Sequence, residues 1–155
     1  MKSRKILVTS ALPYANGSIH IGHVLESVIT DIWVRYQNLN GNECLYFCAD
    51  DTHGTPVMLK AKELEIDSEE LIKRTREEHI KSYSKFNINF DNFYTTHSNE
   101  NKKYAEDIYQ KCKEGNLIFK KEIEQFYDSE EGLFLSDRFI KGTCPKCSAE
   151  DQYGD

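Results

Sequence analysis

The chain has 155 residues, a length that suits one domain, or one domain and part of another. Hydrophobic residues make up 39% and charged residues 30%, which is typical of a globular protein and excludes a disordered chain. The net charge of −6 disfavours non-specific nucleic-acid binding, which depends on basic side chains. No apolar run reaches the roughly 18 residues of a membrane span, and no secretory signal is recognisable, so we expect a cytosolic protein.

The first part of the chain predicts a βαβ unit. Lys5–Ser10 is a short apolar run bounded by polar residues, as in a buried strand, and Pro13 ends it. Apolar residues then recur at helical spacing over Ile21–Tyr36, up to the stop signal Asn38–Gly41. A second buried strand is predicted over Glu43–Ala49. The two strands of such a unit are parallel.

Further α/β elements are predicted in the middle of the chain. They are helices over Pro56–Glu63, Asp67–Phe86 and Asn99–Cys112, and a strand over Asp91–Thr95. Asp67 or Ser68 caps the second of these helices, and Ser98 caps the third, which Gly115 closes. After Gly115, the mixed apolar and charged runs Leu117–Tyr127 and Gly132–Ile140 predict short strands in a small, mostly β insertion.

Five cysteines, an odd number, argue against a disulfide framework. Cys44, Cys48 and Cys112 are expected to be buried and to act as small hydrophobic residues. Cys144 and Cys147 form a Cys-x-x-Cys turn, which supplies two thiolates at zinc spacing but needs a second pair to complete a tetrahedral site. A free thiol pair and half a zinc site therefore both stay open. A redox pair is disfavoured because the turn does not open a helix after a strand.

The stretch Ala11–His23 connects the first strand to the first helix. The free backbone N–H groups at a helix start favour phosphate binding. His20 and His23 lie three residues apart, hence on one helix face, and both can donate hydrogen bonds to phosphate oxygens. Gly22 lets a ligand approach the backbone. The alternatives are one surface and one packed histidine, or a zinc pair, for which no third ligand lies nearby in sequence.

The acidic loop Asp50–Pro56 follows the second predicted strand directly. Ligands of open parallel sheets bind at the carboxyl ends of strands, where this loop and the Ala11–His23 turn both lie. If the strands are neighbours, the two loops share one crevice. Asp51 is then a candidate ligand-binding carboxylate and Tyr14 a candidate wall of the pocket; alternatively, Asp51 caps a helix and Tyr14 is a packing aromatic.

Three stretches of the sequence resemble the bacterial methionyl-tRNA synthetases, a family of class I aminoacyl-tRNA synthetases. They are Ala11–Gly17, Ala49–Pro56 and Lys141–Cys147, and the His-Ile-Gly-His sequence of His20–His23 matches the class hallmark HIGH. The resemblance covers the whole chain in order. The HIGH segment is shared with the leucine, isoleucine and valine enzymes, whereas the acidic loop and the cysteine turn favour methionine.

The resemblance implies a two-step reaction. Methionine attacks the α-phosphate of ATP, which acts with Mg²⁺, to give methionyl-adenylate and pyrophosphate, and the methionyl group then passes to the 3′-end of its tRNA. The implied catalytic residues are His20 and His23. ATP binding is assigned to Tyr14, His20, Gly22 and His23, methionine binding to Leu12, Tyr14 and Asp51, and a possible Zn²⁺, with half its ligand set, to Cys144 and Cys147.

The resemblance also implies an α/β fold: the first half of a doubly wound parallel, Rossmann-like sheet, followed by the start of a small zinc-knuckle insertion domain. Residues 1–115 would be the N-terminal half of the nucleotide-binding catalytic domain, and 116–155 the start of the connective domain. The family's KMSKS loop and anticodon-binding domain have no counterpart here, so we expect most tRNA contacts elsewhere and little activity or stability from these residues alone. A small HxGH nucleotidylyltransferase or a non-catalytic truncated paralogue are the alternatives.

Overall fold

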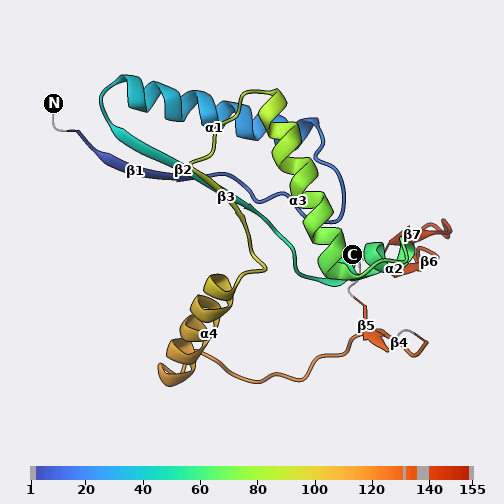
Figure 1. Ribbon diagram of the computed structural model, residues 1–155. Helices are drawn as coiled ribbons and strands as arrows, with labels where there is room; N and C mark the ends of the chain where they lie inside the picture. The colour runs from blue at the N-terminus through green and yellow to red at the C-terminus, as the bar shows by residue number, and fades with distance from the viewer. Residues whose placement is uncertain (1–2, 131, 136–139, 154–155) are drawn as a thin grey trace. The chain divides into compact units, whose positions relative to one another are not determined.

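Three parallel strands form a sheet in the N-terminal part of the chain (Figure 1). The strands β1 (Lys5–Thr9), β2 (Glu43–Asp50) and β3 (Asn92–Thr95) lie in the order β1-β2-β3. This computed structural model describes residues 3–130, 132–135 and 140–153. The chain divides into two units, residues 1–110 and 111–155. The parallel βαβ unit predicted from the sequence is confirmed.

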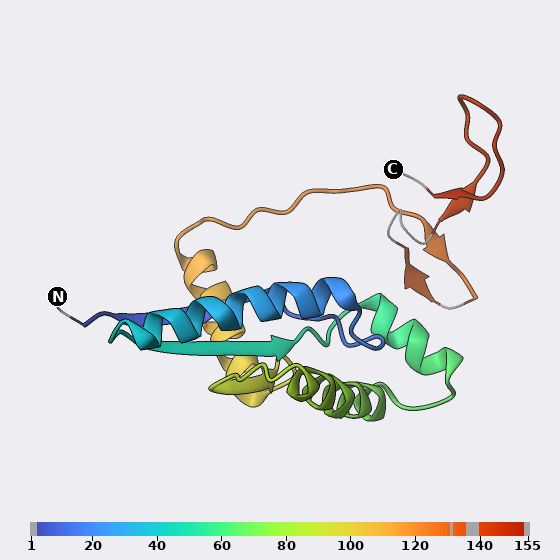
Figure 2. The same cartoon turned by 90° about the horizontal axis from the view of Figure 1, so that it is seen from above.

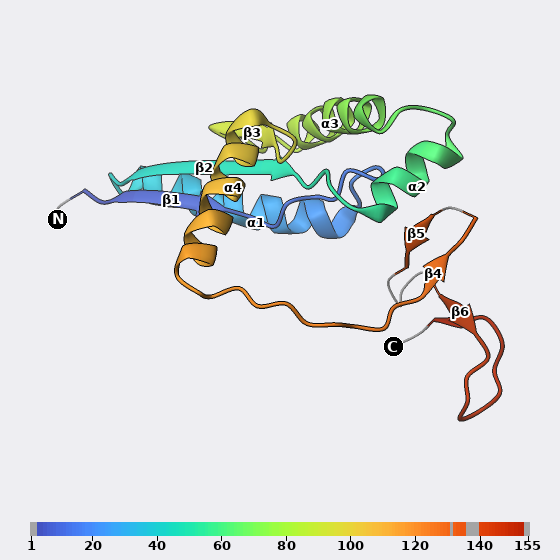
Figure 3. The ribbon, with the colours of Figure 1, turned by 90° about the horizontal axis from the view of Figure 1, so that it is seen from below.

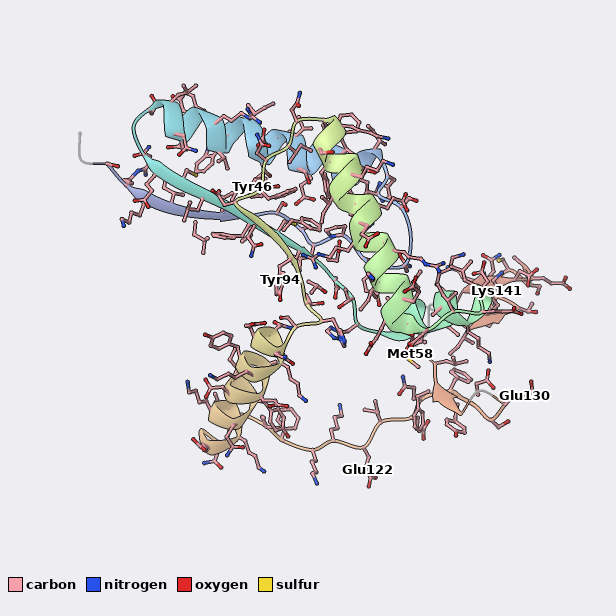
Figure 4. All side chains as sticks on the ribbon, viewed as in Figure 1. Tyr46, Met58, Tyr94, Glu122, Glu130 and Lys141 are labelled. Atoms are coloured by element: carbon pink, nitrogen blue, oxygen red, sulfur yellow. The ribbon has the colours of Figure 1, made fainter. Side chains whose placement is uncertain are left out.

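Two helices pack on one face of this sheet. They are α1 (Ile21–Leu39) and α3 (Ser68–Lys85). Helix α1 lies in front of the strands in Figure 2 and behind them in Figure 3, which views the molecule from the opposite side. The core between the helices and the sheet consists of Val34, Cys44, Tyr46, Tyr83 and Ile88. Figure 4 marks Tyr46 on β2, where its fully buried side chain is central to that core. The sheet thus has one well-covered face.

Helix α1 places a partly polar stripe against the sheet. Its buried residues are Val24, Ser27, Asp31, Val34 and Gln37. The apolar residues that predicted the helix, among them Ile21, Leu25, Ile29 and Ile32, are 59–78% exposed. Ser27 is buried in this stripe, where its side chain lowers the pKa values of the buried Tyr46 and Tyr83 and so opposes the effect of their burial.

The first strand, β1, was predicted to be buried, but one of its two faces is exposed. β1 lies at the edge of the sheet, and Leu7 on its uncovered face is 70% exposed. β2 is central and buries alternate residues, including Cys44 and Cys48, as predicted. Cys112 is only partly buried, contrary to expectation, because α4 (Asn99–Glu114) has no buried residue.

The helix starts follow local capping signals. Asp67 caps α3 through its side chain, and the Ser98 hydroxyl accepts a hydrogen bond of 3.1 Å from the Asn101 N–H at the start of α4. Helix α2 (Thr55–Glu63) follows β2 and packs against α3 through Val57, Ala61 and Leu71. None of the helices in the described ranges combines the length and apolar character that a membrane span requires.

The second unit contains two short hairpins. Their strands are β4 (Tyr127–Asp128) with β5 (Leu133–Phe134), and β6 (Lys141–Gly142) with β7 (Gln152–Tyr153). The short strand predicted within Leu117–Tyr127 is confirmed only at its end, where Tyr127 pairs with Phe134. Residues 117–126 form no strand, and Leu117, Phe119 and Ile123 are largely exposed. Of the run predicted over Gly132–Ile140, residues 136–139 lie outside the described residues.

Candidate functional site

The Ala11–His23 turn and the acidic loop lie side by side at the carboxyl ends of β1 and β2. The Asp51 N–H donates to the Pro13 carbonyl at 2.9 Å, and the Ala15 N–H donates to the Asp51 carbonyl at 2.8 Å. The Tyr14 hydroxyl donates to the His53 carbonyl at 2.6 Å. These bonds extend the β1–β2 pairing beyond the strands, and the structure therefore brings together the two loops that the sequence predicted to share a crevice.

His20 and His23 form a reciprocal cap at the start of α1. The His20 Nδ1 accepts a hydrogen bond from the Gly22 N–H at 3.1 Å, and the His23 Nδ1 accepts one from the His20 N–H at 3.3 Å. The two rings stack with their centroids 3.8 Å apart. A neutral imidazole that accepts at Nδ1 carries its proton on Nε2. The cap therefore leaves each histidine with an Nε2–H donor for a ligand.

The lowered pKa of His23 is consistent with a neutral ring, as this tautomer requires. Its pKa is lowered from the ordinary value, first by partial burial and then by the positive charge that His20 and His79 carry when protonated, while Glu26 opposes the change. His23 is therefore neutral at pH 7, with one donor and one acceptor nitrogen. The acceptor, Nδ1, is bonded to the His20 backbone N–H, so the donor, Nε2–H, is left for a ligand.

Gly22 lies directly under the His20 ring. A Cβ atom at this position would lie 2.9 Å from His20 Cε1 and 3.0 Å from His20 Nδ1. Any side chain here would therefore displace the ring and break the cap. The sequence predicted a close approach of a ligand to the Gly22 backbone; the structure adds the close approach of His20 as a second reason for glycine.

The residues assigned to methionine lie around the junction of the two loops. Leu12 is 41% exposed, and Tyr14 and Asp51 are partly buried, with their backbones paired as parallel neighbours. Asp51 does not cap α2, because the N-cap residue is Gly54 and that helix has no side-chain cap bond. The structure shows no hydrogen bond or ion pair from the Asp51 carboxylate to any of the described residues.

Tyr14 connects packing and position. Its ring packs against the small apolar cluster of Val57, Ala61 and Leu71, so the packing interpretation of this residue is partly right. Its hydroxyl also reaches the acidic loop, and a Cβ atom added at Gly54 would lie 2.6 Å from that hydroxyl oxygen. Tyr14 therefore fixes the distance between the two loops.

A buried histidine–aspartate pair under the turn was missed in the sequence. The His79 Nδ1 lies 2.7 Å from Asp50 Oδ1, and the His79 Nε2 lies 2.8 Å from the Gly17 carbonyl oxygen. Both side chains are fully buried. Burial lowers the pKa of His79, but the hydrogen bonds to Asp50 and Gly17 and the charge of Asp50 outweigh it, so the pKa is raised. The spacing of residues could have indicated that His79 is buried, because it lies four residues from Thr75 and from Tyr83 on the buried face of α3.

A cavity of about 650 Å³ opens near the carboxyl ends of β2 and β3. His53 and His97 are among its lining residues, with ring centroids 5.6 Å apart. His97 follows β3 and lies 3.7 Å from a carboxylate oxygen of Glu69. His53 belongs to the acidic loop but was not among its predicted site residues, and His97 belongs to none of the motifs found in the sequence.

The Cys-x-x-Cys turn lies in the second unit, between β6 and β7. The Cys144 N–H donates to the Ala149 carbonyl at 2.8 Å, and the Ser148 N–H donates to the Cys144 carbonyl at 2.9 Å. Backbone N–H groups of Lys146 and Cys147 hydrogen-bond to the Cys144 sulfur and lower its pKa. Such donors favour a thiolate, the form that binds zinc. No group of three or more metal-ligating side chains occurs within the residues that the structure describes.

Solved structures share this fold. The Agrobacterium radiobacter K84 agnB2 LeuRS, in a ternary complex with tRNA and LeuAMS, superimposes with a TM-score of 0.77 at 20% identity, over 97% of this chain and 20% of that one. Mycobacterium tuberculosis methionyl-tRNA synthetase, in complex with methionyl-adenylate, gives 0.76 at 19% identity, over 97% and 30%. These likenesses establish the predicted α/β, Rossmann-like fold class.

Sequence relatives are much closer. Methionine–tRNA ligase of Neisseria meningitidis serogroup C is 59% identical over 153 residues, covering 99% of this chain and 22% of that protein. The Francisella tularensis subsp. holarctica ligase is 59% identical over 152 residues, covering 98% and 23%. The chain thus spans about a fifth of the length of these relatives. The profile of the family described as "tRNA synthetases class I (M)" matches residues 6–155, and the chain belongs to this methionyl family of class I tRNA synthetases.

Proposed function

We propose that these residues supply the HIGH-bearing part of the active site of a methionine–tRNA ligase. The observation that carries the proposal is the reciprocal cap of His20 and His23, which leaves both Nε2–H donors at a helix start. The turn before this helix pairs through its backbone with the loop that carries the Asp51 carboxylate. The two donors and the helix start suit phosphate, and the carboxylate suits an ammonium group. ATP and methionine satisfy both requirements.

In the first step, His20 and His23 would donate hydrogen bonds to the phosphates of ATP as the methionine carboxylate attacks the α-phosphorus. Such in-line transfer depends on positioned donors more than on covalent participation by the protein. The Nε2–H groups suit this role, because they can donate hydrogen bonds to phosphate without a change in protonation. Gly22 would let the adenine approach the helix start, and Tyr14 would close the site on the side of the acidic loop.

Methionine would bind at the junction of the two loops. The Asp51 carboxylate and the backbone at Leu12 would hold its ammonium group, and Tyr14 would form part of the pocket wall. Asp51 suits this role because the backbone fixes its position through Pro13 and Ala15, while its carboxylate has no partner in the described chain. Mg²⁺ would accompany ATP, and tRNA would then receive the methionyl group.

The second unit fits half of a zinc site. The Cys144–Cys147 turn presents two sulfurs, and backbone N–H donors at Cys144 stabilise a thiolate, as metal ligation requires. Zinc bound here would supply a structural cross-link and no chemistry in the activation step. We also propose that residues 1–115 belong to the nucleotide-binding domain and residues 116–155 to the connective domain.

Methionine-dependent exchange of pyrophosphate into ATP tests the proposal in the full-length protein. We expect exchange with methionine and none with leucine. We also expect the His20→Ala variant to lose about 100-fold or more in rate, the usual effect of removing one positioned donor. Exchange without any amino acid would instead indicate a small HxGH nucleotidylyltransferase, and a folded protein without exchange would indicate a binding paralogue.

A further inference from the structure

The buried His79–Asp50 pair lies beneath the turn that leads to the HIGH segment. His79 projects from α3, Asp50 ends β2, and the Gly17 carbonyl belongs to the turn itself. The hydrogen bonds of 2.7 and 2.8 Å connect residues 29 and 62 positions apart in sequence. One imidazole ring therefore ties a helix, a strand end and a loop together at one point.

The direction of one of these bonds follows from chemistry alone. A backbone carbonyl oxygen only accepts, so the His79 Nε2 carries a proton and donates it to Gly17. At Nδ1, the histidine and the Asp50 carboxyl share the second proton, and the pair is held together whichever atom carries it. The aspartate thereby fixes the ring orientation that aims Nε2–H at the turn.

Gly17 occupies a sensitive position in the turn. The last backbone pairing with the acidic loop is at Ala15, and the helix cap begins at His20. The stretch between them, residues 16–18, is exposed on its outer side. The bond from His79 therefore ties this stretch to the protein interior three residues before the first catalytic candidate.

The pair is poorly suited to stability alone. The second carboxylate oxygen of Asp50 is buried and has no hydrogen-bond partner among the described residues. An unsatisfied buried oxygen is unfavourable, and apolar residues often stabilise such a site at least as well as a buried ion pair does. A purely structural role gives little reason for these two side chains, whereas a directional donor to the turn does.

We propose that His79, oriented by Asp50, is a positioning residue for the activation step: its Nε2–H fixes the Gly17 carbonyl and thereby the place of the His20 and His23 donors. The inference rests on the proposed function, because the phosphate donors are the groups being positioned. The pair would also connect the ATP and methionine binding sites, because Asp50 directly precedes Asp51, the candidate ligand of the methionine ammonium group.

Two substitutions at one position separate the two bonds. In His79→Gln, the side-chain amide nitrogen can take the place of Nε2 and still donate to the Gly17 carbonyl. In His79→Asn, the shorter side chain reaches the Asp50 side and not Gly17. Both remove the imidazole and leave Asp50 without its usual partner. Tyr83→Phe is the control, because it perturbs the same buried face of α3 one turn further on and has no bond to the turn.

Pyrophosphate-exchange kinetics of the full-length protein are measured alongside amide hydrogen exchange of residues 17–23 and the folded fraction. Relative to His79→Gln, we expect His79→Asn to lower kcat about tenfold or more, with the KM for ATP within about threefold, since misplaced donors are felt mainly in the transition state. The amides of residues 17–23 should exchange about tenfold faster in the Asn variant. Tyr83→Phe should alter neither quantity at equal folded fraction.

Equal kcat values and equal amide exchange in the Gln and Asn variants would overturn the proposal, whether both rates are high or both are low. If the parent protein shows no methionine-dependent exchange but the amides respond as expected, the bond positions the turn and the proposed function is what fails. If the amides respond and kcat does not, the tie is structural and the assignment to the activation step is wrong.

Discussion

We predict that replacing Gly22 by alanine displaces the His20 ring and lowers kcat, with little change in the stability of the fold. The added Cβ would lie 2.9 Å from His20 Cε1 and 3.0 Å from His20 Nδ1, closer than two such atoms can remain. The atoms that must yield belong to the end of a rotatable side chain, so the ring moves and the backbone does not. The 3.1 Å cap bond to the Gly22 N–H and the 3.8 Å stacking on His23 are then lost.

The effect on stability is small because two contributions oppose each other. Glycine within a helix is less favourable than alanine by about 0.5–1 kcal/mol. Loss of a side-chain cap typically costs about 1 kcal/mol. The free energy of unfolding should therefore change by less than about 1 kcal/mol. Loss of a positioned phosphate donor, in contrast, corresponds to about 100-fold to 1,000-fold in kcat, or about 3–4 kcal/mol in the activation barrier.

The assay compares methionine-dependent pyrophosphate exchange with chemical denaturation for the same proteins. Ser18→Ala, an exposed position in the same turn, is the control and should leave both quantities unchanged. A Gly22→Ala variant with kcat within threefold of the parent would refute the role of the His20 ring. A fall of more than about 2 kcal/mol in unfolding free energy would show that the backbone, and not the ring, yields to the methyl group.

Three further predictions concern other parts of the site. Asp51→Asn should raise the KM for methionine about tenfold or more and leave that for ATP near its parent value, because a charge-assisted bond to an ammonium is worth about 1.5–3 kcal/mol; equal changes in both KM values would contradict the assignment. The pKa of His79 is raised above its ordinary 6.5, so the pair contributes stability that is fully present below about pH 6.5 and lost as the pH rises through the folded pKa. The unfolding free-energy difference between the parent and His79→Gln should therefore shrink from pH 6 to pH 9, and a constant difference would argue against it. Cys144→Ser should lower the zinc bound per chain, measured by atomic emission on the full-length protein, and unchanged zinc would remove Cys144 from the ligand set.

The fold was predictable where its signals are local. The cap at Asp67, the proline at the start of α2 and the glycine after Asn40 mark helix ends through backbone rules that act over a few residues. The parallel pairing of β1 and β2 followed from the strand–helix–strand order. The face that α1 buries was not predictable, because it includes the polar residues Ser27, Asp31 and Gln37 and leaves much of the apolar stripe exposed.

The candidate site divides in the same way. The HIGH segment and the acidic loop are contiguous motifs, and the sequence indicated both. The tie between Gly17, Asp50 and His79 spans 62 residues. Gly17 and Asp50 lie in the two motifs, but His79 has no local pattern that distinguishes it from a core residue of α3. The position of α3 relative to the turn decides which groups His79 can contact. This position results from tertiary packing and cannot be read from a local stretch of the sequence.

The cap at the start of α1 shows why histidine occupies both of its positions. Asparagine, aspartate and serine are the preferred N-cap residues, and glutamate or glutamine usually completes the reciprocal cap three residues later. A carboxylate at either position would cap the helix and repel a phosphate, and the first turn of α1 contains no acidic residue. Imidazole accepts from the backbone with one nitrogen and offers a donor with the other. Histidine therefore combines capping with anion binding at the same helix end, which a carboxylate cannot do.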